Sequence, residues 1–202
     1  MPEGAGAPTV AVVLCAGAGS RFVGPGGRSK LLQPLHGRPL VAWALENALA
    51  AGLGATVAVT GPTALSGVAP EGVVLVANPA WREGIATSLA AALDWAAERG
   101  FGAVVVGLGD QPLVLPAAWR AVAEAPGPVA VATYGGARRN PVKLARSVWG
   151  ELPVSGDEGA RTLMRQRPEL VHEVPCDGDP LDVDTYEDMD LARQLTSRGP
   201  GA

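Results

Sequence analysis

The chain has 202 residues, of which 48% are hydrophobic, and its formal net charge is −4. A chain of this length can bury one sizeable core, and an acidic protein whose basic residues are scattered is not expected to bind nucleic acid or an anionic membrane surface. Its apolar runs are broken by glycine or proline well before the roughly 20 residues that a membrane span needs. We therefore expect a cytoplasmic protein with small-molecule partners.

Continuous apolar runs alternate with segments whose apolar residues have helical spacing. The expected strands are residues 10–15, 55–60, 73–77, 103–108 and 129–133, and the expected helices are residues 39–49, 85–99, 117–124 and 186–195. Strands that are apolar throughout and alternate with helices are typical of a parallel sheet covered on both faces. The sequence therefore predicts an α/β fold.

The alternation weakens after the fifth expected strand. Residues 138–142 and 155–161 are polar and are expected to form loops beside short elements. No composition shift marks a second domain, so we expect one domain over residues 9–195. The glycine- and alanine-rich residues 1–8 and residues 196–202 are expected to be disordered ends.

The first expected strand runs into a glycine-rich, cationic loop, Ala16-Gly17-Ala18-Gly19-Ser20-Arg21, and the cationic stretch ends at Lys30. Glycines let successive backbone N–H groups converge on an anion, and the two cations add full charges. Arg21 and Lys30 are nine positions apart, which favours a triphosphate held from both sides. The structural alternative is a solvated turn with two surface cations.

Two common phosphate loops do not match this stretch. A dinucleotide-binding loop needs a third glycine where Phe22 stands, and it needs an acidic residue at the end of the next strand, where residues 55–60 have none. A P-loop needs glycine before its lysine and serine or threonine after it, whereas Ser29 and Leu31 flank Lys30. An NAD fold and a P-loop NTPase are therefore both disfavoured.

Carboxylates at two later positions indicate a metal site. Asp110 directly follows the strongest strand, and ligands of parallel α/β sheets bind at the carboxyl ends of strands. A triphosphate-bound Mg²⁺ takes one or two carboxylates, so Asp182 or Asp184 is expected to supply the second. The two are not expected to be equivalent, because residues two apart share a face only in a regular strand and the helix start at Thr185 bends this segment. The alternatives are turn formation or capping by Asp110, and helix capping by Thr185 and Asp188 on a solvated acidic face.

Six motifs follow one another in an order found in a known family. They are Leu14-Cys15-Ala16-Gly17-Ala18-Gly19-Ser20-Arg21 with Lys30-Leu31-Leu32, Asn78-Pro79-Ala80-Trp81-Arg82-Glu83-Gly84 running into Ser88-Leu89, Gly109-Asp110-Gln111-Pro112, Asn140-Pro141-Val142, Gly156-Asp157-Glu158-Gly159-Ala160-Arg161 and Asp182-Val183-Asp184-Thr185. With them the chain resembles the MobA-like nucleotidyltransferases, and among these the molybdenum cofactor cytidylyltransferase branch. The resemblance implies a single-domain, three-layer α/β/α Rossmann-like nucleotidyltransferase fold with a mostly parallel central sheet.

The resemblance also implies an activity: transfer of a nucleoside monophosphate from an NTP to a phosphorylated acceptor, with release of pyrophosphate. By similarity, Arg21, Lys30 and Asp110 would be catalytic, and Asp110 with Asp182 or Asp184 would hold Mg²⁺. The implied nucleotide-binding residues are Leu14, Ala16, Gly17, Ala18, Gly19, Ser20, Arg21, Lys30, Gly84 and Ser88, and the implied acceptor-binding residues are Asn140, Gly156, Asp157 and Arg161.

Ala16 indicates the base, because the guanylyltransferases of this family resemble Leu-Ala-Gly-Gly at the strand end and the cytidylyltransferases Leu-Ala-Ala-Gly. CTP is therefore the expected donor. The expected acceptor is a phosphorylated pterin of the molybdenum cofactor, with contact to a molybdoenzyme as a further expectation. The alternatives are a sugar phosphate or another small phosphorylated acceptor, and a non-catalytic accessory protein that binds the cofactor.

Neither histidine nor cysteine is expected to take part in catalysis, since transfer between phosphates needs no Ser-His or Cys-His pair. His36 and His172 are expected to be ordinary surface or hydrogen-bonded residues. Cys15 lies within the first strand and Cys176 near the end of the chain, and both are expected to be free thiols in a compartment that does not favour disulfides.

Overall fold

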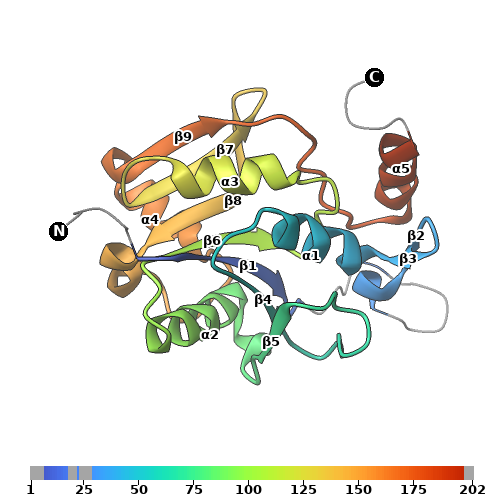
Figure 1. The fold of residues 1–202 in the computed structure, drawn as a ribbon, viewed down its shortest axis with the longest axis horizontal. Coiled ribbons are helices and arrows are strands. Elements are labelled where there is room, and N and C mark those ends of the chain that lie inside the picture. The colour runs from blue at the N-terminus through green and yellow to red at the C-terminus, as the bar shows by residue number, and fades with distance from the viewer. Residues whose placement is uncertain (1–6, 18–21, 23–28, 198–202) are drawn as a thin grey trace.

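The computed structural model describes residues 7–17, 22 and 29–197, and within them it contains five α-helices and nine strands (Figure 1). The helices are α1 (Leu40–Ala50), α2 (Ile85–Glu98), α3 (Pro116–Glu124), α4 (Ala160–Gln166) and α5 (Tyr186–Ser197). The strands are β1 (Thr9–Cys15), β2 (Pro34–Leu35), β3 (Arg38–Pro39), β4 (Ala55–Thr60), β5 (Val73–Ala77), β6 (Ala103–Leu108), β7 (Val129–Tyr134), β8 (Ala137–Ala145) and β9 (Val171–Pro175).

Seven of these strands form one sheet in the order β5-β4-β1-β6-β8-β7-β9. Only β8 runs against its neighbours, and every other pair is parallel. In β1, Val12 pairs with Val57 of β4 and with Val106 of β6, so the strand that precedes the glycine-rich loop lies inside the sheet. The mostly parallel sheet predicted from the sequence is confirmed.

Helices cover both faces of the sheet, which makes three layers (Figure 1). Successive residues of β1 point to opposite faces of the sheet: Val12 packs into the cluster under α2, and Val13 packs into the cluster under α1 and α3. Both side chains are fully buried, and burying a valine contributes about 1.5–3 kcal/mol. The need to fill both layers explains why the strands are apolar throughout.

The last helix, α5, does not cover the sheet and packs beside the small β2–β3 hairpin (Figure 1). Leu35, Val183 and Met189 are buried in the cluster between them. The N-terminus of α5 is closed by a reciprocal cap, in which the Asp188 N–H donates to Thr185 Oγ1 (3.1 Å) and the Thr185 N–H donates to Asp188 Oδ2 (2.8 Å). The predicted cap is confirmed.

One of the two segments that were expected to be loops is regular structure: residues 138–142 belong to β8, which enters the sheet between β6 and β7. In the other segment, residues 155–159 form the expected loop and residues 160–161 begin α4. The first half of β8 is exposed and polar while Val142 and Leu144 are buried, so the strand lacks the continuous apolar run of its neighbours. The exposed edge strand β9, which holds His172, was not predicted for a similar reason.

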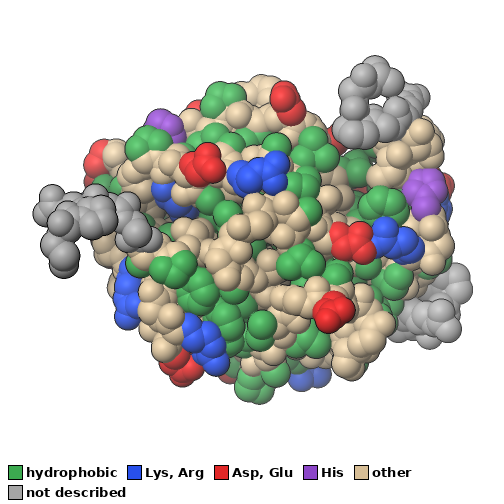
Figure 2. Space-filling view, viewed as in Figure 1, with side chains coloured by type: hydrophobic (Ala, Val, Ile, Leu, Met, Phe, Trp, Pro, Cys, Tyr) green, Lys and Arg blue, Asp and Glu red, His purple; other side chains and the backbone are tan. Residues whose placement is uncertain are grey.

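Surface features agree with the composition. On the face seen in Figure 2, acidic and basic side chains are scattered singly, and the basic ones do not gather into a patch. Cys15 and Cys176 are free thiols, as predicted. Of the helices within the described ranges, none is both long and apolar enough to cross a bilayer.

Candidate functional site

Lys30 lies at the carboxyl ends of β1 and β6, between two carboxylates. Its Nζ is 2.6 Å from Asp110 Oδ2 and 2.7 Å from Asp184 Oδ1. Lys30 begins the short 3-10 helix η2 (Lys30–Leu32), and only 8% of the residue is exposed. Segments from three distant parts of the chain therefore meet at one ammonium group, and two of the three catalytic residues named from the sequence, Lys30 and Asp110, lie in direct contact.

The charge of Lys30 is fixed by its surroundings. Burial by itself lowers the pKa of an ammonium group, but here Asp110 and Asp184 outweigh it, and the pKa of Lys30 is raised. The side chain is therefore fully protonated at neutral pH. A buried ammonium that is already oriented at the strand ends can interact with a polyanion, provided that the anion replaces one of its carboxylate partners.

Asp110 and Asp182 form a pair of like charges. Asp110 Oδ1 is buried, and among the described residues it has no hydrogen-bond partner. Partial burial, and next the charge of Asp110, raise the pKa of Asp182. The Val183 N–H donates to the Asp110 carbonyl (3.0 Å), which holds the Asp182 segment beside the end of β6. An unpaired carboxylate oxygen beside a second carboxylate fits the donor set that Mg²⁺ prefers.

Within the described residues no three His, Cys, Asp or Glu side chains cluster to hold a metal ion by themselves. The carboxylate pair therefore fits an ion that brings most of its oxygen ligands with it, as a triphosphate-bound Mg²⁺ does. Asp182 and Asp184 have different partners: Asp182 Oδ1 accepts from Gln111 Nε2 (2.8 Å), whereas Asp184 Oδ1 accepts from Lys30.

A pocket of about 620 Å³ opens beside this cluster, on the sheet face that α2 and α4 cover. Its floor is apolar and its rim is charged. Gln111 and Asp182 line it and so connect it to the Lys30 cluster. The lining residues are Leu14, Ile85, Leu89, Val106, Leu108, Gln111, Val131, Arg138, Arg139, Asn140, Val142, Leu144, Asp157, Glu158, Gly159, Ala160, Arg161, Met164, Arg165 and Asp182.

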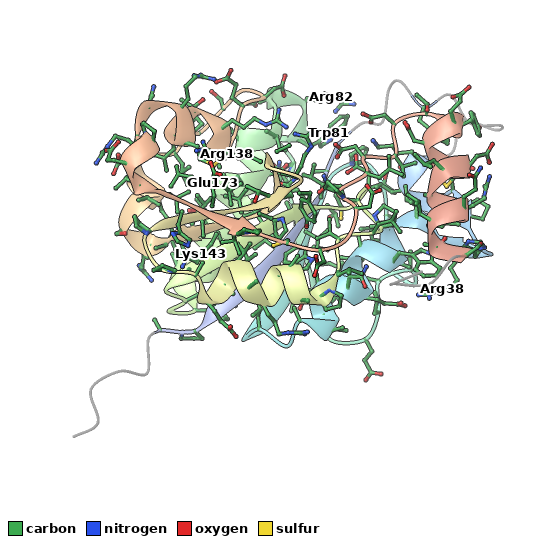
Figure 3. All side chains as sticks on the ribbon, turned by 90° about the horizontal axis from the view of Figure 1, so that it is seen from above. Arg38, Trp81, Arg82, Arg138, Lys143 and Glu173 are labelled. Carbon is green, nitrogen blue, oxygen red and sulfur yellow. The ribbon has the colours of Figure 1, made fainter. Side chains whose placement is uncertain are left out.

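Four arginines stand around the pocket, and two of them are engaged with carboxylates. Arg138 donates to Glu173 (2.8 Å), and Figure 3 shows these two side chains side by side; Arg165 binds Glu158 (2.5 Å). Arg139 and Arg161 also line the pocket, and within the described part of the chain neither forms an ion pair. They are the cations at the rim that can accept an anionic group without first breaking a salt bridge.

The structure places the sequence-predicted acceptor residues largely together. Asn140, Asp157 and Arg161 line the pocket, and Gly156 lies behind its rim. The Gly156 carbonyl accepts from the Ala86 N–H (3.0 Å), and the Gly156 N–H donates to the Glu83 carbonyl (2.9 Å). Gly156 therefore attaches the rim loop to the start of α2.

Gly84 and Ser88, predicted to bind the nucleotide, do not line the pocket. Gly84 has φ = +107°, and a Cβ there would lie 2.3 Å from the Gly156 carbonyl oxygen, so close packing of the backbone requires glycine. Ser88 is buried and accepts a hydrogen bond from Asn78 Nδ2 (2.9 Å). The contacts of both residues organise the start of α2 and the rim loop, and their role in nucleotide binding stays a prediction.

The predicted phosphate loop is described only at its start. Leu14 lines the pocket, Ala16 is buried, and Gly17 has open space where a Cβ would stand. Gly61 packs against Ala16, since a Cβ on Gly61 would lie 2.6 Å from the Ala16 carbonyl oxygen. The remaining expected loop residues lie outside the described residues: Ala18, Gly19, Ser20 and Arg21.

Several site residues were not predicted from the sequence. Gln111, Arg138, Arg139, Glu158 and Arg165 all line the pocket. The position of Gln111 directly after Asp110 was a usable signal, because side chains at a strand end face the ligand crevice. The arginines gave no such signal, since they reach the pocket only through β8 and α4, which the sequence pattern did not reveal.

Comparisons with known proteins agree with this geometry. Residues 11–172 match the family model of a MobA-like NTP transferase domain. Over 198 residues the chain is 34% identical to the nicotine blue oxidoreductase of Paenarthrobacter nicotinovorans, covering 91% of this chain and 93% of that protein.

Two solved structures also resemble the chain along nearly its whole length. A nucleotidyl transferase from Methanothermobacter has a TM-score of 0.80 and 25% identity, with 95% of this chain and 98% of that chain covered. Rv0371c from Mycobacterium tuberculosis H37Rv, in complex with manganese, has a TM-score of 0.73 and 29% identity, with 94% and 99% covered.

Proposed function

This chain belongs to the MobA-like NTP transferase family, and from that membership we propose that it transfers CMP from CTP to the phosphate of a molybdopterin-type acceptor and releases pyrophosphate. The observation that carries the proposal is the protonated Lys30, held between Asp110 and Asp184 at the strand ends beside a pocket of about 620 Å³. That volume lies in the range of small-molecule sites.

Transfer between phosphates depends on positioning and on charge stabilisation. In this reaction an oxygen of the acceptor phosphate attacks the α-phosphorus of the NTP, the bond to the bridging oxygen breaks, and pyrophosphate leaves with that electron pair. Lys30 would exchange a carboxylate for the α-phosphate and neutralise the charge that grows there. Arg21, with the amides of the loop before it, would hold the outgoing phosphates.

Mg²⁺ is the proposed cofactor, held by Asp110 and one of the two later aspartates. The unpaired Asp110 Oδ1 and the repulsion that Asp182 experiences from Asp110 favour Asp182. The ion would neutralise phosphate charge during transfer. The manganese complex of Rv0371c supports a divalent cation as the cofactor.

The pocket supports an acceptor with a flat apolar part and an anionic group. Leu108, Val142 and Met164 offer an apolar surface to a ring system, and Arg139 and Arg161 offer charge to a phosphate. Asn140 and the loop through Gly156 and Asp157 would orient such a molecule. A phosphorylated pterin has both features, and a molybdoenzyme would then receive the product.

The two later aspartates are expected to differ in metal binding. Asp182→Asn should weaken Mn²⁺ binding about 10-fold or more, whereas Asp184→Asn should have a smaller effect, because Asp184 is already bound to Lys30. Electron paramagnetic resonance of free Mn²⁺ measures both affinities directly. Asp177→Asn, on the exposed loop before this segment, controls for the change in net charge. Equal losses in the two variants would contradict the assignment of Asp182.

Selection of the base is expected to depend on Ala16. A methyl group at this position would narrow the floor of the site for the base and disfavour a purine, and a difference of one methyl is worth a preference of about 10- to 200-fold in kcat/KM. We expect CTP to be preferred over GTP, and Ala16→Gly to reduce the preference in part. Ala50→Gly, at the exposed end of α1, is the matched control. Equal or higher kcat/KM with GTP in the unchanged protein would overturn the base assignment and leave the transferase assignment intact.

The experiment that tests the function is pyrophosphate release with each of the four NTPs, with and without a phosphorylated pterin. Release that needs CTP, a divalent cation and the pterin together is the expected result. Release with a sugar phosphate in place of the pterin would indicate a different acceptor. Binding of the pterin without any release of pyrophosphate would indicate a non-catalytic accessory protein. The Asp110–Asp182 carboxylate pair and the buried Lys30 disfavour this alternative, because a protein that only binds the cofactor has less need of them.

A redox function is the second candidate, because the relative with 34% identity over nearly the whole chain is named an oxidoreductase. The apolar floor of the pocket would also accept a flat dye. Phe22, at the position of the third glycine of a dinucleotide loop, argues against it. Oxidation of a reduced nicotinamide dinucleotide by nicotine blue, catalysed by the chain without any NTP, would favour this candidate over the transferase.

A further inference from the structure

Gln111 occupies a position between the acceptor pocket and the carboxylate pair. It lies just after the end of β6, and only 3% of the residue is exposed. On one side its Oε1 accepts from Asn140 Nδ2 (3.0 Å), and on the other its Nε2 donates to Asp182 Oδ1 (2.8 Å). The residue therefore joins a side chain of the pocket wall to one of the two carboxylates.

The direction of the Gln111 amide follows from its neighbours. The Asn140 amide group presents a donor, so it faces the oxygen end of Gln111 and leaves the nitrogen end for Asp182 and for the Pro180 carbonyl (3.4 Å). A carboxylate accepts hydrogen bonds only, so the opposite orientation of the Gln111 amide would place two oxygens against each other at Asp182 and two N–H donors against each other at Asn140. The orientation of one amide thus determines whether Asp182 is held or repelled.

We propose that Gln111 is a positioning residue, which holds Asp182 beside Asp110 for a divalent cation, and that Asn140 sets the direction of the Gln111 amide. Asn140 also lines the pocket, so an acceptor that forms a hydrogen bond with the Asn140 amide would change the contacts from Asn140 through Gln111 to Asp182. Metal affinity and acceptor affinity are then coupled, and the coupling is reciprocal. The inference rests on the proposed function, because it takes the carboxylate pair as a metal site.

The physical basis is the effect of groups that orient a metal ligand without touching the metal. Their loss typically lowers metal affinity by about 10- to 100-fold, because the ligand must then be ordered when the ion binds. Asp184 differs from Asp182, because its Oδ1 accepts from the Lys30 ammonium. The two aspartates therefore differ in their partners: a neutral amide contacts Asp182, and a charged ammonium contacts Asp184.

The sharpest variant is Asn140→Asp, which keeps the size of the side chain and removes the donor. The new carboxylate turns the Gln111 amide so that its oxygen faces Asp182, and Mn²⁺ affinity should fall about 10-fold or more despite the added negative charge. A purely electrostatic effect has the opposite sign, because an extra carboxylate attracts the cation. Electron paramagnetic resonance of Mn²⁺ with the otherwise unchanged chain gives the affinity without any turnover.

Gln111→Met tests the other half of the proposal, since it keeps the volume and removes the hydrogen bonds to Asn140, Asp182 and the Pro180 carbonyl. Mn²⁺ affinity should fall by a similar factor, and adding Asn140→Asp to it should cause no further fall, because the two changes break the same chain of contacts. Gln194→Met, on the exposed side of α5, is the matched control. Thermal unfolding establishes that each variant is folded. If Gln111→Met does not fold, the Mn²⁺ affinity of Asn140→Asp alone tests the proposal.

The outcomes are distinct. Unchanged or tighter Mn²⁺ binding in Asn140→Asp overturns the inference, as does additive weakening in the double variant, while pyrophosphate release by the unchanged chain leaves the proposed function standing. Mn²⁺ binding that is insensitive to Asp110→Asn and Asp182→Asn overturns the metal site and the inference together. Weaker binding in both variants, without additivity, supports it.

Discussion

Replacing Lys30 by alanine is expected to lower the turnover number by about 10²-fold or more while the chain stays folded. The ammonium is already charged, buried and oriented, so it stabilises charge on the α-phosphate without reorganisation, and the loss of one such contact has this size. Steady-state pyrophosphate release at saturating NTP and acceptor measures the effect, and KM is expected to change less than kcat.

Folding has to be separated from catalysis in this variant, because removing Lys30 leaves Asp110 and Asp184 without their shared cation. Lys143→Ala is the matched control: it is the other lysine of the chain, it is buried, and it donates to the Ala125 carbonyl at the end of α3 (Figure 3). We expect Lys143→Ala to lower the melting temperature and to leave kcat per folded molecule unchanged. A folded Lys30→Ala protein with near-normal kcat would contradict the catalytic assignment.

Much of the fold could be predicted because its central strands are buried on both faces. Three of the five predicted strands, β4, β5 and β6, have the predicted bounds, and β1 and β7 are each one residue longer. Short continuous apolar runs that alternate with helical segments are typical of strands buried on both faces of a parallel sheet. The sheet class followed from the alternation of such runs with helices.

The antiparallel strand β8 could not be predicted by the same reasoning. Its first four residues are exposed or half-buried, and only its second half faces the core, so neither a continuous apolar run nor a strict alternation appears. What makes it a strand is the space between β6 and β7, with which it pairs on both sides. That is a property of the assembled sheet, which a local pattern does not contain.

The candidate site divides in the same way. Lys30 and Asp110 could be named from the sequence because each follows a strong strand, and the topology of a parallel sheet brings strand ends together. Arg139 and Asn140 reach the pocket only because β8 lies beside β6. Gly84 packs against the backbone of Gly156, a contact between segments far apart in the sequence that the motif alone did not reveal.

Asp110→Asn is expected to have an effect on turnover at least as large as that of the Lys30 variant, about 10²-fold or more. Asp110 Oδ2 binds the Lys30 ammonium at 2.6 Å, and the buried Oδ1, which has no hydrogen-bond partner within the described ranges, is left for a metal ion. The asparagine keeps the shape of the side chain and removes the charge. It would therefore remove the proposed metal ligand and one of the two groups that orient Lys30.

Two measurements distinguish these contributions. If Asp110 binds the metal, the Mn²⁺ affinity of Asp110→Asn falls along with kcat, and raising the Mn²⁺ concentration recovers part of the activity. If Asp110 only orients Lys30, Mn²⁺ affinity is unchanged and added metal recovers nothing. Asp190→Asn, an exposed residue of α5 paired with Arg193, removes the same charge far from the strand ends and should change neither quantity. Because the buried Oδ1 has no partner among the described residues, we expect Mn²⁺ affinity to fall along with kcat. An unchanged Mn²⁺ affinity would remove Asp110 from the metal site and leave it as a group that orients Lys30.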